Sequence, residues 1–175
     1  MIFSVKRNIL AILAVAMTAS QAGAEIVSSS ASHYELKHEA LSTLPPTAIW
    51  QRLQNPGSWW HPDHTYSGDS RNMSVELQAG GVWREDWDGK SVLHGTVLYL
   101  EPQKVLRLNA PFGPLQQMGV TTIWTINISA EGSGSMISFS ETSGGSSHSG
   151  LDKIAPAVDF VKSEAIKRLA NISNE

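Results

Sequence analysis

The sequence H-P-D-H at residues 61–64 is one place where this chain could bind a metal or move protons. Imidazole and carboxylate groups are both ligands that zinc accepts, and His38 or His94 could complete a set from elsewhere in the fold. The spacing matches no standard zinc signature, however, and a polar loop at the mouth of a cavity has the same composition. We therefore expect no metal and no other cofactor, and name His61, Asp63 and His64 as the candidate ligands if a metal does bind.

Glu85 is a second candidate for chemistry, because its position in a strand places it among aromatic residues. Side chains alternate between the two faces of a strand, so Glu85 shares a face with Trp83 and Trp87. If that face lines a cavity, burial would raise the pKa of the carboxyl group and make it a general acid or base. We take Glu85, His38 and His94 as catalytic candidates. The alternative for each is a buried polar group whose hydrogen bonds are satisfied by a neighbour.

The first 24 residues have the pattern of a cleavable signal peptide. Lys6 and Arg7 precede an apolar stretch from residue 9 to residue 17, and Ala22-Gly23-Ala24 supplies the small residues that signal peptidase requires. The apolar stretch is too short to span a bilayer stably. We therefore predict cleavage after Ala24, export to the periplasm or the medium, and no stable membrane insertion of the mature chain.

The predicted mature chain has the size and charge of one acidic domain. Residues 25–32 are small and polar and predict a flexible leader, and residues 33–173 predict a single domain. Loss of Lys6 and Arg7 leaves 11 basic residues against 16 acidic ones, a net charge of −5. Without a basic cluster, the domain is a poor candidate for binding nucleic acid. The chain has no cysteine, which excludes disulfides and thiol chemistry.

Apolar periodicity predicts a mixed order of strands and helices. Alternation over residues 33–41 indicates a half-buried strand, with Tyr34, Leu36, His38 and Ala40 on one face. Pro45-Pro46 then begins a short helix that Asn55-Pro56-Gly57 ends. Further strands are predicted at residues 73–77, 82–87, 91–100, 105–108, 121–129 and 136–141. Because short turns join most of them, the sheet should be antiparallel.

A long amphipathic helix is predicted at the end of the chain. Apolar residues recur at helical spacing from Leu151 to Leu169, and this helix is the only predicted element long enough to cover the apolar face of the sheet. Pro156 interrupts the pattern. We place it in the first turn of the main helix, with residues 150–155 as a separate turn before it.

The element order and several short motifs resemble the helix-grip superfamily, the START-related SRPBCC domains that include polyketide cyclases and birch-pollen-allergen-like proteins. The motifs are Pro46 with Ile49-Trp50 and Leu53, Asn55-Pro56-Gly57-Ser58-Trp59-Trp60, Gly80-Gly81-Val82-Trp83-Arg84-Glu85, and His94-Gly95-Thr96-Val97 with Glu101-Pro102. The resemblance covers about residues 34–169. It implies an α+β fold in which a curved antiparallel sheet of about seven strands wraps around the C-terminal helix, with two short helices after the first strand and a cavity in between.

That resemblance leads us to expect binding of a small apolar or amphipathic molecule, since no complete catalytic motif is visible. The expected ligand-binding residues are Trp59, Trp60, His61, His64, Trp83, Glu85, Trp87, Leu115, Met118 and Trp124. The tryptophans are equally suited to filling the core. Whether the chain is an enzyme stays open. A cyclase- or hydrolase-type enzyme with Glu85 and a histidine as acid–base pair is the first alternative, and a protein-interaction module of the chaperone-activator type is the second.

Overall fold

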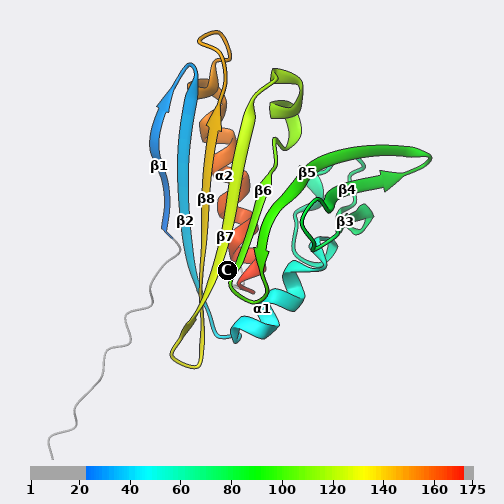
Figure 1. Ribbon diagram of the computed structural model, residues 1–175, viewed down its shortest axis with the longest axis vertical. Helices are drawn as coiled ribbons and strands as arrows, with labels where there is room; N and C mark the ends of the chain where they lie inside the picture. The colour runs from blue at the N-terminus through cyan, green and yellow to red at the C-terminus, as the bar shows by residue number, and fades with distance from the viewer. Residues whose placement is uncertain (1–22, 172–175) are drawn as a thin grey trace, which may run out of the picture.

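An open, eight-stranded antiparallel sheet forms the body of the computed structural model, which describes residues 23–171 (Figure 1). The strands follow the order β1-β2-β8-β7-β6-β5-β4-β3, with β1 and β3 at the edges. Their bounds are β1 (Gly23–Ser30), β2 (His33–Ser42), β3 (Met73–Val75), β4 (Val82–Trp87), β5 (Lys90–Glu101), β6 (Val105–Asn109), β7 (Thr121–Glu131) and β8 (Gly134–Gly144). Register shifts in the β1–β2, β4–β5 and β5–β6 pairs mark bulges, which bend strands.

The long helix α2 (Leu151–Leu169) packs against one face of this sheet, over β1, β2 and β8. Figure 1 shows it running lengthwise behind β8 and β7. The alternation predicted for β2 is confirmed, because Tyr34, Leu36, His38 and Ala40 are all buried. The predicted fold class is therefore confirmed: an α+β domain with an antiparallel sheet and a long C-terminal helix. Among the described residues, no helix has the length and apolarity needed to cross a membrane.

Short helical segments follow β2 and sit beside the β3–β5 end of the sheet (Figure 1). α1 (Pro46–Leu53) begins at the predicted proline and buries Ile49, Trp50 and Leu53. Three single-turn 3₁₀ helices come next, η1 (Pro56–Ser58), η2 (Pro62–His64) and η3 (Ser70–Asn72). A fourth, η4 (Gly113–Met118), lies between β6 and β7. A proline lies near the start of α1, η1, η2 and η4. Proline suits this position because the first backbone N–H groups of a helix have no partner within the helix.

The predicted flexible leader at residues 25–32 is wrong, because β1 occupies most of it and pairs with β2. Strand pairing uses backbone groups, so small polar side chains do not prevent it. Ile26 also packs against the cluster that contains Tyr34 and Leu36. Of the predicted signal peptide, residues 1–22 lie outside the described residues, and Gly23 and Ala24 begin β1. Cleavage after Ala24 would leave residues 25–30 of that strand.

The expected break before Pro156 is also wrong, because α2 is continuous from Leu151 and contains Pro156 within it. A proline inside a helix leaves the carbonyl four residues earlier without its usual donor. That carbonyl belongs to Asp152, an exposed residue close to the start of the helix, where water can replace the missing amide.

Candidate functional site

A cavity of about 450 Å³ lies between α2, the segment after Trp60, and the η4 region. Its walls are mostly apolar, and the polar groups among its lining residues include two charged side chains, Lys162 and Glu141. The lining residues are Trp60, His64, Thr65, Tyr66, Phe112, Gly113, Pro114, Leu115, Gln117, Glu141, Ile154, Ala157, Val158, Val161 and Lys162. The cavity therefore lies between the C-terminal helix and two loop segments, and Glu141 on β8 is the one lining residue within the described chain that belongs to a strand.

A buried ion pair forms part of the cavity wall. Lys162 Nζ on α2 lies 2.8 Å from Glu141 Oε2 on β8, and both side chains are 2 % exposed. The hydroxyl group of Tyr34 on β2 donates a 2.6 Å hydrogen bond to Glu141 Oε1. Burial lowers the pKa of Lys162, although the Glu141 carboxylate opposes this shift. Burial raises the pKa of Tyr34, and the charge of Glu141 raises it further.

Aromatic rings complete the surroundings of Lys162. Nζ lies 3.2 Å from the ring centroid of Trp124 and 4.9 Å from that of Phe112. Such contacts stabilise a cation through the negative faces of the rings. Within residues 23–171, Nζ has no hydrogen-bond partner beyond its ion pair with Glu141. An ammonium group has three N–H donors, so the site keeps unused donor capacity.

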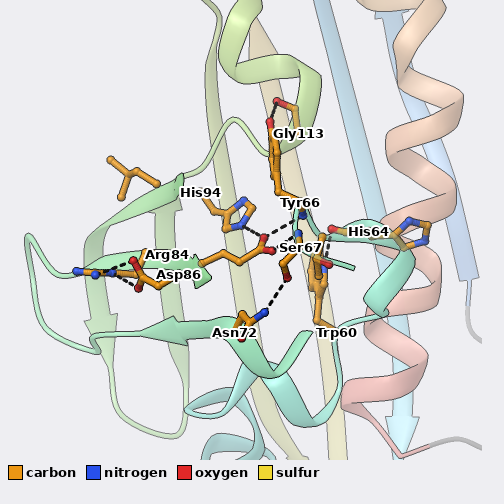
Figure 2. A network of polar contacts seen from close by, with 12 residues as sticks. Trp60, His64, Tyr66, Ser67, Asn72, Arg84, Asp86, His94 and Gly113 are labelled. Carbon is orange, nitrogen blue, oxygen red and sulfur yellow. Dashed lines mark hydrogen bonds and ion pairs between the residues drawn. The ribbon is translucent and has the colours of Figure 1, made fainter. Parts of the chain in front are cut away.

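Glu85 is fully buried on β4 and accepts hydrogen bonds from the loop that follows η2. Figure 2 shows Tyr66 and Ser67 of that loop beside His94. Glu85 Oε1 accepts a 2.6 Å hydrogen bond from the backbone N–H of Ser67. Its Oε2 accepts from the backbone N–H of Tyr66 at 3.1 Å and lies 3.0 Å from His94 Nε2. The expected rise in its pKa is wrong: burial does raise the pKa of Glu85, but the hydrogen bonds from Ser67, Tyr66 and His94 lower it more. Glu85 is thus an ionised acceptor for the loop.

His94 does not line the cavity itself and contacts it through neighbouring rings. It stacks on Phe112 with ring centroids 4.9 Å apart and planes 15° apart, and Phe112 itself lines the cavity. Burial lowers the pKa of His94, although the neighbouring Glu85 opposes this. The structure therefore brings the catalytic candidates Glu85 and His94 together, but places both behind the cavity wall.

The third catalytic candidate, His38, is buried under α2 and not beside Glu85. Its Nε2 lies 2.8 Å from Asp159 Oδ1, and burial lowers its pKa more than Asp159 raises it. His64 makes a similar contact with α2, at 2.8 Å from Glu164 Oε2. Both histidines hold the helix to the rest of the domain.

The H-P-D-H segment forms η2, at the edge of the cavity. His61 Nδ1 accepts a 3.1 Å hydrogen bond from the backbone N–H of Asp63, and the rings of His61 and His64 are 5.2 Å apart. Among residues 23–171, no group of three histidine, aspartate or glutamate side chains is arranged to hold a metal ion.

The residues expected to bind a ligand divide into three groups. Trp60, His64 and Leu115 line the cavity. Trp59, Trp83 and Trp124 are buried in the core, where they pack against one another or against Trp60. His61, Glu85, Trp87 and Met118 are not among the lining residues.

Sequence reasoning missed the two charged residues of the cavity wall, Lys162 and Glu141. Lys162 falls four residues after Val158 and three before Ala165, on the buried stripe of α2, so helical spacing was a usable signal. Glu141 alternates with the buried residues Phe139 and Ser143 on β8, which was a second signal.

Acid should destabilise the fold below about pH 6.5, the ordinary histidine pKa. The pKa values of His38 and His94 are lowered in the folded state, so the unfolded chain binds protons first as pH falls, and folding stability is lost. Glu85, also with a lowered pKa, adds to this loss below its ordinary value of 4.5. Urea unfolding between pH 7.5 and pH 5 measures the effect.

The matched variants for this pH test are His38→Gln and His148→Gln. The first should flatten the loss of stability between pH 7 and pH 5, whereas the second, on an exposed residue, should leave it unchanged. Equal stability of the wild-type chain at pH 7.5 and pH 5 would contradict the lowered pKa values of His38 and His94.

Comparison with known proteins supports the fold and gives no function. No family model matches the chain, and no curated protein matches it. Solved structures do match. A conserved protein of unknown function from Enterococcus faecalis has 14 % identity and a TM-score of 0.56, over 84 % of this chain and 75 % of that one. A protein from Chromobacterium violaceum has 16 % identity and a TM-score of 0.56, over 79 % and 95 %.

A third similar structure, of a protein from Mycobacterium smegmatis, has 13 % identity and a TM-score of 0.56, over 87 % of this chain and 96 % of that one. Likeness at such identities shows a shared fold and nothing about activity. The fold, an antiparallel sheet with a C-terminal helix, is compatible with the helix-grip architecture.

Proposed function

We propose that this chain is an exported member of the SRPBCC, START-like superfamily and binds a small, largely apolar molecule. The observation that carries the proposal is the cavity of about 450 Å³ between α2, the Trp60–Tyr66 segment and η4. Its volume falls in the range of roughly 300–1,000 Å³ that is usual for small-molecule sites. The motif resemblance and the compatible fold support the superfamily, and the pattern of residues 1–24 supports export.

The lining of the cavity supports a ligand with an apolar body and one polar end. Ile154, Val158, Val161 and Leu115 offer aliphatic contacts, and burying apolar surface against them contributes about 25 cal/mol per Å². The charged groups Lys162 and Glu141 are neighbours in the wall, and His64, Thr65 and Gln117 are further polar lining residues. We expect the polar end of the ligand to lie toward the charged pair.

A cavity-filling substitution tests this function. Ala157 is exposed on α2 and lines the cavity, so Ala157→Trp should fill part of it without disturbing the core. We expect the affinity for N-phenyl-1-naphthylamine, an uncharged apolar fluorescent probe, to fall at least tenfold. The matched control is Lys153→Trp, which adds the same side chain to an exposed position of the same helix that does not line the cavity. Equal probe binding by all three proteins, or by none, would overturn the proposal.

An acid–base enzyme is the second candidate, favoured by one observation. Glu85 and His94 are both buried and lie 3.0 Å apart, which is the geometry of a general base with an orienting carboxylate. Neither residue lines the cavity, however, and Phe112 covers His94 on the cavity side. Binding is therefore the function that the geometry supports better.

A further inference from the structure

We propose that Lys162 binds its ligand covalently: its amine condenses with the aldehyde or ketone group of an apolar molecule in the cavity, giving a protonated imine and water. This inference rests on the proposed function of the cavity and names its ligand class. Lys162 is the one lysine among the described residues that line the cavity. The comparison lysines Lys37, Lys90, Lys104 and Lys153 are exposed.

Burial favours the neutral form of the Lys162 amine, because the side chain is 2 % exposed and removed from water. The Glu141 carboxylate and the faces of Trp124 and Phe112 favour the cation, but the net shift of the Lys162 pKa is downward. A desolvated lysine in an apolar pocket is the form in which this residue acts as a nucleophile toward carbonyl groups. Exposed lysines, with pKa values near 10.4, remain protonated at neutral pH.

Glu141 supplies the proton acceptor and donor that the condensation requires. Its carboxylate, 2.8 Å from Nζ, takes one proton from the ammonium group. The nitrogen lone pair then forms a bond to the carbonyl carbon, and one proton passes from the attacking nitrogen to the carbonyl oxygen, which gives a carbinolamine. Protonation of that hydroxyl group by Glu141 releases it as water, while the nitrogen lone pair forms the C=N bond. Two hydrogens of the ammonium group leave with the carbonyl oxygen, and the third stays on the imine nitrogen.

The charge of the site is the same before and after this reaction. An ammonium cation paired with Glu141 becomes an iminium cation paired with Glu141, and Trp124 lies beside the cation in both states. Tyr34 keeps the carboxylate oriented through its hydrogen bond to Oε1. A carboxylate ligand would instead bring a second negative charge next to Glu141, which is unfavourable in an apolar site. The pair therefore favours a neutral carbonyl group over an acid.

Side chains around Nζ must move for the reaction to occur, because Nζ itself is buried. We expect Phe112 to move, since its ring lines the cavity and lies 4.9 Å from Nζ. We therefore expect covalent labelling to develop over time, and not at the moment of mixing.

Reductive trapping tests the proposal on the full chain. The protein is incubated at pH 7 with decanal and sodium cyanoborohydride, which reduces an imine to a stable secondary amine, and the label is located by peptide mass mapping. We expect Lys162 to be labelled at least tenfold more than any exposed lysine. The N-terminal amine, with an ordinary pKa of about 8, serves as an internal reference for an exposed reactive amine.

Two variants and one competing ligand make the outcome decisive. Lys162→Arg keeps the positive charge but cannot form an imine, and should lose the label, whereas Lys153→Arg should keep it. If Lys162→Arg does not fold, mapping of the wild-type protein decides alone. If the label appears only on exposed lysines or the N-terminal amine, while decanol still displaces the naphthylamine probe, the imine proposal is overturned. The binding function would then still hold. Failure of both decanol and the probe to bind would overturn the binding function as well.

Discussion

Replacing Lys162 with methionine is expected to destabilise the folded chain by about 3–5 kcal/mol, the usual loss when one partner of a buried ion pair is removed. Methionine fills a similar volume, so the loss would come from the carboxylate of Glu141, left buried without its cation. Tyr34 would still donate one hydrogen bond to it, which does not replace a positive charge. Urea unfolding of the variant and the wild-type protein measures the difference.

A second substitution separates the lost ion pair from lost packing. In the double variant Lys162→Met with Glu141→Gln, the charge that was left unpaired is gone, while the amide oxygen still accepts from Tyr34. We expect this double variant to be more stable than Lys162→Met alone, and the exposed control Lys153→Met to be within about 0.5 kcal/mol of wild type. A loss below about 1 kcal/mol for Lys162→Met would show that the pair is not buried as described.

Replacing Glu85 with glutamine is expected to destabilise the fold by about 1–3 kcal/mol. Both carboxylate oxygens accept hydrogen bonds from backbone N–H groups, of Tyr66 and of Ser67. A glutamine side chain has one acceptor oxygen, so its NH₂ group would face an N–H donor. Urea unfolding measures the loss, and faster amide hydrogen exchange at Tyr66 and Ser67 would show that the loop has loosened.

Asp86→Asn is the matched control for Glu85→Gln. Asp86 is the next residue on β4, and its ion pair with Arg84 is about 40 % exposed, so removing the charge should change stability by less than about 1 kcal/mol. Equal effects of the two substitutions would contradict the role of Glu85 as the loop's acceptor. Because Glu85→Gln disturbs the cavity wall, loss of an activity in this variant would not by itself identify a catalytic acid or base.

The fold was largely predictable because the main elements carry strong periodic signals. Alternation identified β2 and placed Trp83 and Glu85 on one buried face of β4. The helical repeat from Leu151 to Leu169 identified the long C-terminal helix, although Pro156 led us to begin it too late. β1 could not be predicted in this way, because an edge strand of small polar residues pairs through its backbone and leaves no apolar pattern.

The site was less predictable, because its groups come from distant parts of the chain. Lys162 and Glu141 meet only through the packing of α2 on β8, and a lysine on a helix usually extends to solvent. Burial of Glu85 could be inferred from alternation. The direction of its pKa could not, because it depends on two backbone N–H groups from a loop whose conformation leaves no pattern in the sequence.

Native mass spectrometry of the purified wild-type chain, beside Ala157→Trp and Lys153→Trp, tests whether the cavity holds a ligand. We expect an organic mass bound to the wild-type and Lys153→Trp proteins and absent from Ala157→Trp. Denaturation should release this mass unless it is joined through Lys162. Spectra that are identical for the three proteins, with no bound mass or with the same bound mass in each, would contradict a ligand site between α2, the Trp60–Tyr66 segment and η4.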